Sequence, residues 1–349
     1  MGLPTVELSA LASVVLVAWV GFAAHRASLC TVRAVAEILS SGTAWMLASF
    51  AKAALWTLAV SGLVLLLSPL SGAPVQQTLP HAVALAGGLV FGIGAALNGG
   101  CSLSTLQRLA DGDLSMFGTL AGFVAGVFAW SMLNHPLELT TLTTQAVLWD
   151  RQSIWAAPVL ILIWLWGVRE IIRLWRPTAE PTAVSALAAL RQRLSAPVYR
   201  LSSSAAILGV AGGVLYTVQG AWTYTNFLRA EAVSWQGAGV APSTLHGTLL
   251  VALLAGMVLS SLQRHSFALQ FDWRVCAGRR VAGGLLMGVG GAVIPGGNDT
   301  LILAAIPTLS PWSLATYIAL LTGVAAALLA MRAFTGLQLR VDCTGDRCH

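Results

Sequence analysis

Charged residues are too scarce in this chain to cover the surface of a water-soluble globule. Asp, Glu, Lys and Arg together make up 9% of the 349 residues, whereas hydrophobic residues make up 57%. A soluble domain carries about 25% charged residues. The apolar residues form continuous runs, not the alternating pattern that a membrane β-barrel requires. The chain is therefore predicted to be an all-α integral membrane protein, a single polytopic domain over residues 1–349.

The apolar runs suggest how many times the chain crosses a bilayer, since one helical span takes about 20 residues. Runs lie at about 8–24, 44–67, 82–98, 117–133, 154–172, 204–220, 245–262, 281–294 and 312–331. Shorter apolar pieces follow Cys30, Cys101 and Asn298. Each piece is too brief to span alone and is predicted to form a re-entrant half-helix. We expect about nine transmembrane helices with these half-helices between them.

The basic residues predict the orientation. The net charge of +6 is read as a topology signal, so nucleic acid is not expected as a partner. An arginine-rich loop at about 173–200 is predicted to be cytoplasmic by the positive-inside rule. A second cytoplasmic segment contains Arg264, Arg274, Arg279 and Arg280. Because no Lys or Arg precedes the first span, the N-terminus is expected outside.

An internal repeat is visible in two glycine-rich apolar segments. Residues 86–97 (AGGLVFGIGAAL) align with residues 282–293 (AGGLLMGVGGAV) at a constant offset of 196, and 7 of the 12 positions are identical. Each copy then reaches a Gly-Gly pair, followed by Cys101 in one and Asn298 in the other. Repeated segments interrupted by glycine are the best sequence indication of a transport site at the membrane midplane. We expect repeat halves at about 8–133 and 245–331.

The two Gly-Gly pairs, Gly99-Gly100 and Gly296-Gly297, are predicted to end a helix and free the backbone. The residue that follows each pair would begin a new short helix, where the N–H groups and the positive dipole end attract an anion. A buried cysteine is most often only a small hydrophobic residue. Cys101 is the exception here, because it follows the glycine break inside a repeat.

Each of the remaining candidate residues has a structural and a functional interpretation. Cys276 is interpreted as a packing residue, whereas Cys30 lies between Arg26 and Arg33. Cys343 and Cys348 form either a dispensable tail or a metal or redox pair, with His349 as a third ligand. Lys52 lies inside an apolar run and is either functional or reaches the interface with its long stem. Asp299 is expected to cap its own short helix.

At these residues the chain resembles the YeeE/YedE family of sulfur-compound transporters. The resemblance rests on His25–Thr31 (HRASLCT), Phe91–Cys101 (FGIGAALNGGC) and Gly283–Gly297 (GGLLMGVGGAVIPGG), and it extends over about 20–331 apart from the arginine-rich loop. It implies an hourglass of transmembrane helices and short re-entrant helices in two pseudo-symmetric halves. It also implies uptake of thiosulfate, or of another sulfur or selenium species, across the bacterial inner membrane.

The resemblance implies a central path along which thiols pass the anion by S–H···S hydrogen bonds. Cys30 and Cys101 match two pathway cysteines of the family, and Asn298 stands where the family has a third. An amide donates hydrogen bonds to oxyanion oxygens but is a poorer partner for a soft sulfur. The full set of path residues expected from the sequence is Cys101, Cys30, Asn298, Gly99, Gly100, Gly296, Gly297, Arg26, Arg33 and Lys52. Related transporters work with a small cytoplasmic sulfurtransferase, so such a partner is expected as a separate protein.

Two other readings stay open at this point. One is a permease for another small anion or neutral solute, with the cysteines incidental. The other is a membrane thiol oxidoreductase that uses Cys343 and Cys348 as a redox pair. No zinc-ligand spacing, nucleophile elbow, P-loop or pair of carboxylates occurs in the sequence. We therefore expect a transporter without cofactor or metal, not an enzyme.

Overall fold

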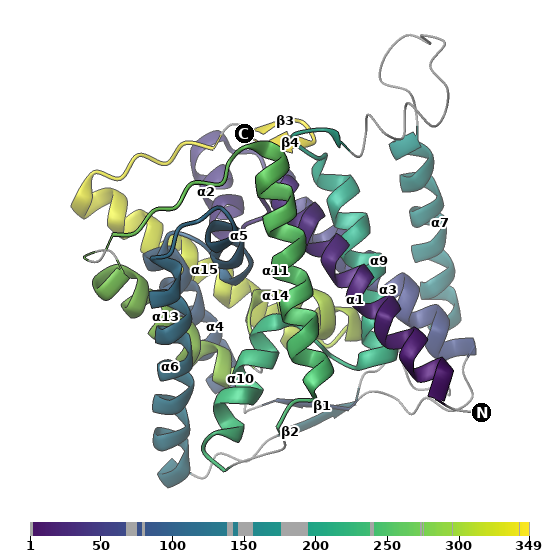
Figure 1. Ribbon diagram of the computed structural model, residues 1–349, viewed down its shortest axis with the longest axis horizontal. Helices are drawn as coiled ribbons and strands as arrows, with labels where there is room; N and C mark the ends of the chain where they lie inside the picture. The colour runs from purple at the N-terminus through teal and green to yellow at the C-terminus, as the bar shows by residue number, and fades with distance from the viewer. Residues whose placement is uncertain are drawn as a thin grey trace.

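The computed structural model is a bundle of long helices with short helices packed between them (Figure 1). It describes residues 3–67, 75–78, 81–137, 142–145, 156–175, 195–237, 241–272, 274, 276–294, 296–341 and 343–348. Most of the predicted arginine-rich loop, at 176–194, lies outside the described residues.

The elements fall into three groups. The long helices are α1 (Leu3–Arg26), α3 (Trp45–Leu67), α4 (His81–Asn98), α6 (Met116–Leu137), α7 (Ala156–Trp175), α9 (Leu201–Gln219), α11 (Thr244–Arg264), α13 (Val281–Val293) and α15 (Pro311–Thr335). The short helical elements are α2 (Thr31–Ser41), α5 (Ser102–Ala110), α10 (Tyr224–Ser234), η1 (Cys276–Arg280), α14 (Asn298–Thr300), η2 (Leu301–Ala305) and η3 (Ile306–Thr308). Two small antiparallel sheets pair β1 (Val75–Thr78) with β2 (Leu142–Gln145) and β3 (Cys343–Thr344) with β4 (Arg347–Cys348).

Within the described residues, 8 helical segments are long and apolar enough to cross a membrane. Several of them join a long helix to the short one beside it, for example Glu7–Ser41 and His81–Ala110. Helices suit this setting because all their backbone hydrogen bonds are made within the segment. The prediction of an all-α integral membrane protein is confirmed, while the count of about nine spans stays a prediction.

The two copies of the glycine repeat, α4 and α13, pack against each other in a reciprocal, antiparallel way. A Cβ atom on Gly94 would lie 2.7 Å from the carbonyl oxygen of Gly283, and one on Gly290 would lie 2.6 Å from that of Gly87. Gly283 and Gly290 are the repeat equivalents of Gly87 and Gly94. Only glycine allows this close approach of two backbones. The repeat glycines are therefore packing residues at the contact between the copies.

The outer faces of the same helices use glycine in the same manner. Gly88 of α4 lies against the backbone of Thr316 in α15, with an ideal Cβ 2.7 Å from its carbonyl oxygen. Its repeat equivalent Gly284 in α13 lies against the backbone of Thr119 in α6. This packing holds α4 and α13 as a central pair between α15 and α6. Whether the whole chain divides into two halves stays a prediction.

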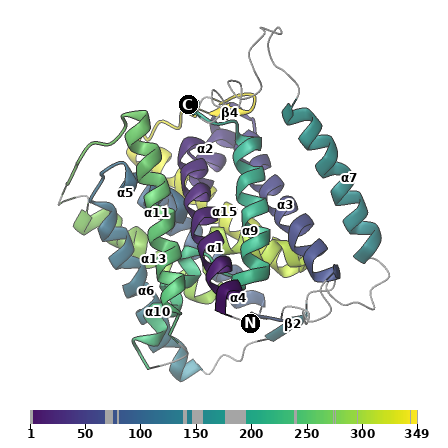
Figure 2. The same cartoon turned by 45° about the vertical axis from the view of Figure 1, so that its right-hand side comes forward.

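The two ends of the bundle differ in charge. The start of α1 and the β1–β2 sheet lie at one end, which we call the distal face, and the β3–β4 sheet lies at the other (Figures 1 and 2). The second end also carries Arg26 and Arg264, at the last turns of α1 and α11. We call it the arginine face. By the positive-inside rule it is the predicted cytoplasmic side.

Candidate functional site

Two short helices begin at the cysteines that the sequence analysis identified. Cys30 and Cys101 are the N-cap residues of α2 and α5, and both have extended backbone conformations. Neither thiol makes a capping hydrogen bond with its own helix. The first N–H groups of these helices thus lack a cap from their own N-cap side chains, and the positive end of each helix dipole points toward the region of the thiols.

The two thiols lie together in the protein interior. Cys30 and Cys101 are 2% and 1% exposed, and both are free. The backbone N–H of Thr31, the first residue of α2, donates to the Cys101 sulfur over 3.4 Å. The Cys30 thiol donates to the hydroxyl of Ser104 in α5, also over 3.4 Å. A contact between residues 70 positions apart in the chain therefore brings two polarisable sulfur atoms into one buried region.

Asn298 completes this group from the second copy of the repeat. Its amide nitrogen donates to the Thr31 hydroxyl over 2.8 Å, and its amide oxygen accepts a hydrogen bond from the Ser102 hydroxyl. Asn298 is 1% exposed. We call Cys30, Thr31, Cys101, Ser102 and Asn298 the thiol–amide cluster. It combines soft sulfur atoms with hydrogen-bond donors, in the interior of an apolar bundle.

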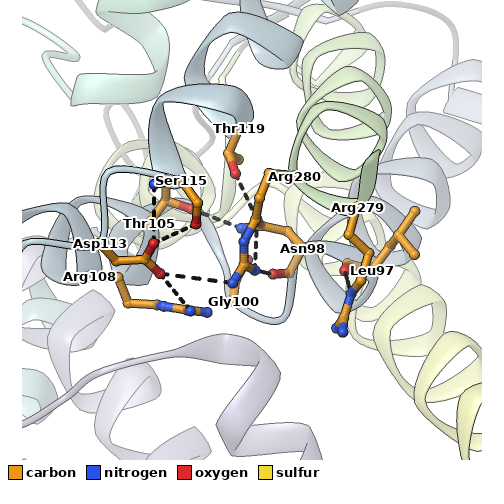
Figure 3. Close-up of polar contacts among 10 residues, drawn as sticks. All are labelled: Leu97, Asn98, Gly100, Thr105, Arg108, Asp113, Ser115, Thr119, Arg279 and Arg280. Atoms are coloured by element: carbon orange, nitrogen blue, oxygen red, sulfur yellow. Dashed lines mark hydrogen bonds and ion pairs between the residues drawn. The ribbon is translucent and has the colours of Figure 1, made fainter. Parts of the chain in front are cut away.

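The turn that carries Cys101 is fixed by Asn98, at the end of α4 (Figure 3). The Asn98 amide nitrogen donates to the carbonyl oxygen of Gly100 over 2.9 Å and to the hydroxyl of Thr105 over 3.0 Å. Thr119 donates to the Asn98 amide oxygen over 2.7 Å. Gly99 has φ +77°, a conformation that side chains rarely adopt. The glycine break thus has a defined shape rather than a loose one.

Arginine side chains surround the same break on its other side. Arg280 donates to the backbone carbonyl of Asn98 and Arg279 to that of Leu97, over 2.8 Å for the latter. Arg108 of α5 forms an ion pair with Asp113 at 2.7 Å (Figure 3). Cations at the C-terminal end of α4 are favoured by the helix dipole. These arginines therefore stabilise the end of the helix that precedes the cluster.

The second glycine break places a carboxylate beside the cluster. Gly296 has φ +128°, and a Cβ atom on Gly297 would meet the Asp299 carboxylate at 2.9 Å. Asp299 accepts hydrogen bonds from the hydroxyl and the backbone N–H of Thr225, over 2.5 and 3.3 Å. Thr225 belongs to α10, so Asp299 joins two short helices. It was expected to cap only its own.

A cavity of about 60 Å³ reaches this carboxylate. Its wall includes Trp222 and Tyr224, where the chain turns from α9 into α10, and it ends at Asn298 and Asp299. The rest of the wall is mainly apolar, from α1, α9, α11 and η2. The cavity thus lies between the end of α9 and two residues of the second glycine break, Asn298 and Asp299.

Two of the predicted path residues, Arg26 and Lys52, bind polar side chains of other helices. Arg26 is 2% exposed; it donates to Ser260 over 3.2 Å and to Gln263 over 2.7 Å, at the end of α11. Lys52 of α3 forms an ion pair with Glu170 of α7 at 2.9 Å. Both cations thus have partners outside the thiol–amide cluster, and their place on the path stays a prediction. Arg33, in the first turn of α2, is half-buried.

The remaining cysteines lie outside the thiol–amide cluster. Cys343 and Cys348 form a disulfide between β3 and β4. This small sheet is anchored to the start of α9, because the Asp346 carboxylate accepts from the Ser202 hydroxyl over 2.7 Å. The side chain of Cys276, and all of His349, lie outside the described residues.

Several residues of the site belong to no recognisable sequence motif. Thr31 and Ser102 directly follow the two cysteines, so their positions at helix starts could have marked them. Thr225 and Tyr224 lie far from any glycine break in the sequence. Only the packing of α10 against α14 brings them to Asp299.

Comparison with known proteins adds two similarities. A family model described as "Sulphur transport" matches residues 26–326, a range that contains the whole thiol–amide cluster. A protein of Spirochaeta thermophila (strain ATCC 700085 / DSM 6578 / Z-1203), the thiosulfate transporter TsuA, is 26% identical over 298 residues. That alignment covers 75% of this chain and 82% of the relative.

Proposed function

The chain belongs to the sulphur transport family, and from this premise we propose that it carries thiosulfate through the thiol–amide cluster. The family and the thiosulfate-transporting relative indicate a transporter of a sulfur-containing anion, not an enzyme. One observation carries the finer proposal. Two free buried thiols, Cys30 and Cys101, each precede a residue whose hydroxyl hydrogen-bonds to the amide of Asn298, at the starts of three helical elements.

The chemistry of the cluster suits this anion. Thiosulfate is a dianion with hard sulfonate oxygens and one soft terminal sulfur. The N–H ends of α2 and α5 and the Ser102 hydroxyl are donors for the oxygens, while the thiols of Cys30 and Cys101 are donors for the soft sulfur. Each contact is individually weak, which a permeating ion requires if it is to leave again.

Asn298 gives this chain its own balance of donors. An amide donates hydrogen bonds to the sulfonate oxygens of thiosulfate, whereas a thiol at the same place would favour its terminal sulfur. Asn298 also links α14 to α2 through Thr31. We infer that it orients the sulfonate end while Cys30 and Cys101 receive the sulfur.

The setting of the protein is proposed on the same grounds. The 8 apolar segments of the described chain and the arginine face suit a multi-pass protein of the bacterial inner membrane, with that face toward the cytoplasm. A separate sulfurtransferase that receives the imported sulfur there would complete the uptake.

The test is growth of a bacterial host that lacks its own sulfate and thiosulfate uptake, with thiosulfate as sole sulfur source. The wild-type chain is expected to restore growth, and Cys101→Ala to abolish it at equal membrane expression. The matched control is Cys348→Ala, a cysteine outside the cluster, which should grow like wild type. Normal growth with Cys101→Ala would refute the thiol path. Absence of growth with well-expressed wild type would refute thiosulfate as the substrate.

A second candidate is a thiol oxidoreductase, which the Cys343–Cys348 disulfide favours. A dithiol–disulfide pair on the arginine face could exchange with a partner thiol. Removal of residues 340–349 separates the two functions, because a transporter keeps its uptake and an oxidoreductase of this kind loses all activity. A mixed disulfide trapped through Cys343 would support the second candidate.

A further inference from the structure

Asp299 is a buried acid that the proposed path does not explain. It is 8% exposed and lies next to Asn298 at the second glycine break. The ion pairs of the described residues do not include it. An ionised carboxylate in a membrane interior is costly unless an opposite charge or a proton neutralises it.

The groups around this carboxylate bring hydrogen bonds but no positive charge. From α10, Thr225 donates through its hydroxyl and its backbone N–H. From α5, Ser102 donates over 3.4 Å. The titratable group that faces Asp299 from these elements is the phenol of Tyr224 in α10, which carries no positive charge. Among these described neighbours, no positively charged group offsets a negative charge on Asp299.

The position of the carboxylate creates a conflict with the anion. The hydroxyl of Ser102, a member of the thiol–amide cluster, has Asn298 and Asp299 within hydrogen-bonding distance, so the acid lies directly beside the cluster. Like charges at such distances repel strongly in a medium of low dielectric constant. A dianion can occupy the cluster only when Asp299 is neutral.

A cavity reaches the Asp299 carboxylate. It extends from Trp222 at the end of α9 to Asp299, so the carboxylate is approached from the distal side of the bundle. The acid and its donors form a compact hydrogen-bonded group, in which Thr225 also contacts Thr300 at 3.2 Å. Such a group has room for a proton on the carboxylate, whereas a sodium ion would need several oxygen ligands in place of these hydrogen bonds.

We propose that Asp299 is a coupling site that takes up one proton from the distal side and releases it with the anion at the arginine face. The inference rests on the proposed function, since it concerns the same anion. One thiosulfate dianion and one proton cross together; the proton binds a carboxylate oxygen of Asp299 from the distal side and leaves that oxygen when the anion leaves the cluster, and no bond of the anion breaks. Because import of a dianion into a negatively charged compartment is uphill, the proton lowers the charge moved inward.

The experiment uses the purified full chain in liposomes with labelled thiosulfate, at clamped membrane potential. Wild type is expected to accumulate thiosulfate above the external concentration when the outside is made acidic. Asp299→Asn, whose side chain is permanently neutral, should exchange internal for external thiosulfate but lose this accumulation. Asp272→Asn is the matched control, because Asp272 is an exposed carboxylate that does not line the cavity, and it should accumulate like wild type.

The other possible outcomes also support or overturn proton coupling through Asp299. Asp299→Asn that accumulates like wild type would overturn the proposal, as would wild-type accumulation driven by a sodium gradient and not by a pH gradient. If Asp299→Asn shows no exchange, Asp299→Glu decides: a displaced pH profile of uptake supports the proposal and an unchanged one overturns it. Wild type without any thiosulfate exchange refutes the proposed function itself, separately from the coupling.

Discussion

Ser102 donates its hydroxyl hydrogen bond to Asn298, a residue 196 positions further along the chain. Asn298 directly follows the second Gly-Gly pair, and Ser102 lies one position after Cys101, which follows the first pair. This hydrogen bond joins the two copies of the repeat just beyond their glycine pairs. The two glycine breaks therefore meet at the centre of the bundle, and the thiols of Cys30 and Cys101 lie at that meeting point.

Asn298 is expected to control both the shape and the selectivity of the cluster. Asn298→Ala leaves Thr31 and Ser102 without their partner, and uptake should fall about tenfold or more, since a lost hydrogen bond to a charged substrate costs about 1.5–3 kcal/mol. Asn298→Cys should keep thiosulfate uptake and lower the competition by sulfate, which lacks a soft sulfur. Labelled uptake with and without excess sulfate measures both. Unchanged uptake by Asn298→Ala would contradict a role in the path.

The close approach of α4 to α13 predicts a stability effect. A Cβ atom on Gly94 would lie 2.7 Å from three atoms of α13, two of them backbone, so Gly94→Ala should lower stability by about 1–3 kcal/mol. Gly278→Ala is the control, because nothing lies within 4 Å of its Cβ position. Thermal unfolding in detergent compares them. Equal melting temperatures would show that the helices are further apart than the structure has them.

Lys52 is expected to act in folding and not in transport. Its ammonium contacts Glu170 at 2.9 Å and Ser202 at 2.7 Å, and Glu170 is buried. Lys52→Met should lower stability by about 1–3 kcal/mol, the cost of a buried group that loses a partner. Arg173→Met, which removes the more exposed partner of Glu170, should cost less. A changed affinity for thiosulfate in folded Lys52→Met protein would place Lys52 on the path after all.

Asp111 gives a pH dependence at the arginine face. Burial raises the pKa of its carboxyl, but hydrogen bonds from His25, Ser266 and Ser261 outweigh this and hold the pKa below the ordinary 3.8. A lowered folded pKa means that the stability from Asp111 is complete above the unfolded pKa and disappears as the pH falls through the folded one. The difference in melting temperature between wild type and Asp111→Asn should therefore be large at about pH 6 and shrink toward about pH 3. A constant difference would contradict this hydrogen-bonded carboxylate.

The sequence predicted the features that depend on local backbone chemistry. A glycine pair followed by a polar residue at the end of an apolar run favours a helix end, so the breaks before Cys101 and Asn298 could be predicted, and the repeat indicated that they belong together. The scarcity of charge made the membrane fold evident. These conclusions needed no knowledge of which helices become neighbours.

What the sequence could not show are pairings between distant elements. Lys52 meets Glu170 across 118 positions, and Arg26 turns toward Gln263 across 237, so both cations were expected on the path while the structure gives them other partners. Asp299 meets Thr225 across 74 positions. No local pattern encodes such contacts, because they follow from how whole helices pack.

The most direct measurement is uptake of labelled thiosulfate into liposomes that contain the purified chain. Wild type is compared with the Cys30→Ser/Cys101→Ser double variant, and with Cys343→Ser/Cys348→Ser as the control for replacement of two cysteines outside the cluster. We predict that the cluster variant loses uptake, although it remains folded, because serine keeps the hydrogen bonds but not the soft sulfur contact. The control variant should transport at the wild-type rate. Full uptake by the cluster variant would contradict a thiol-lined path.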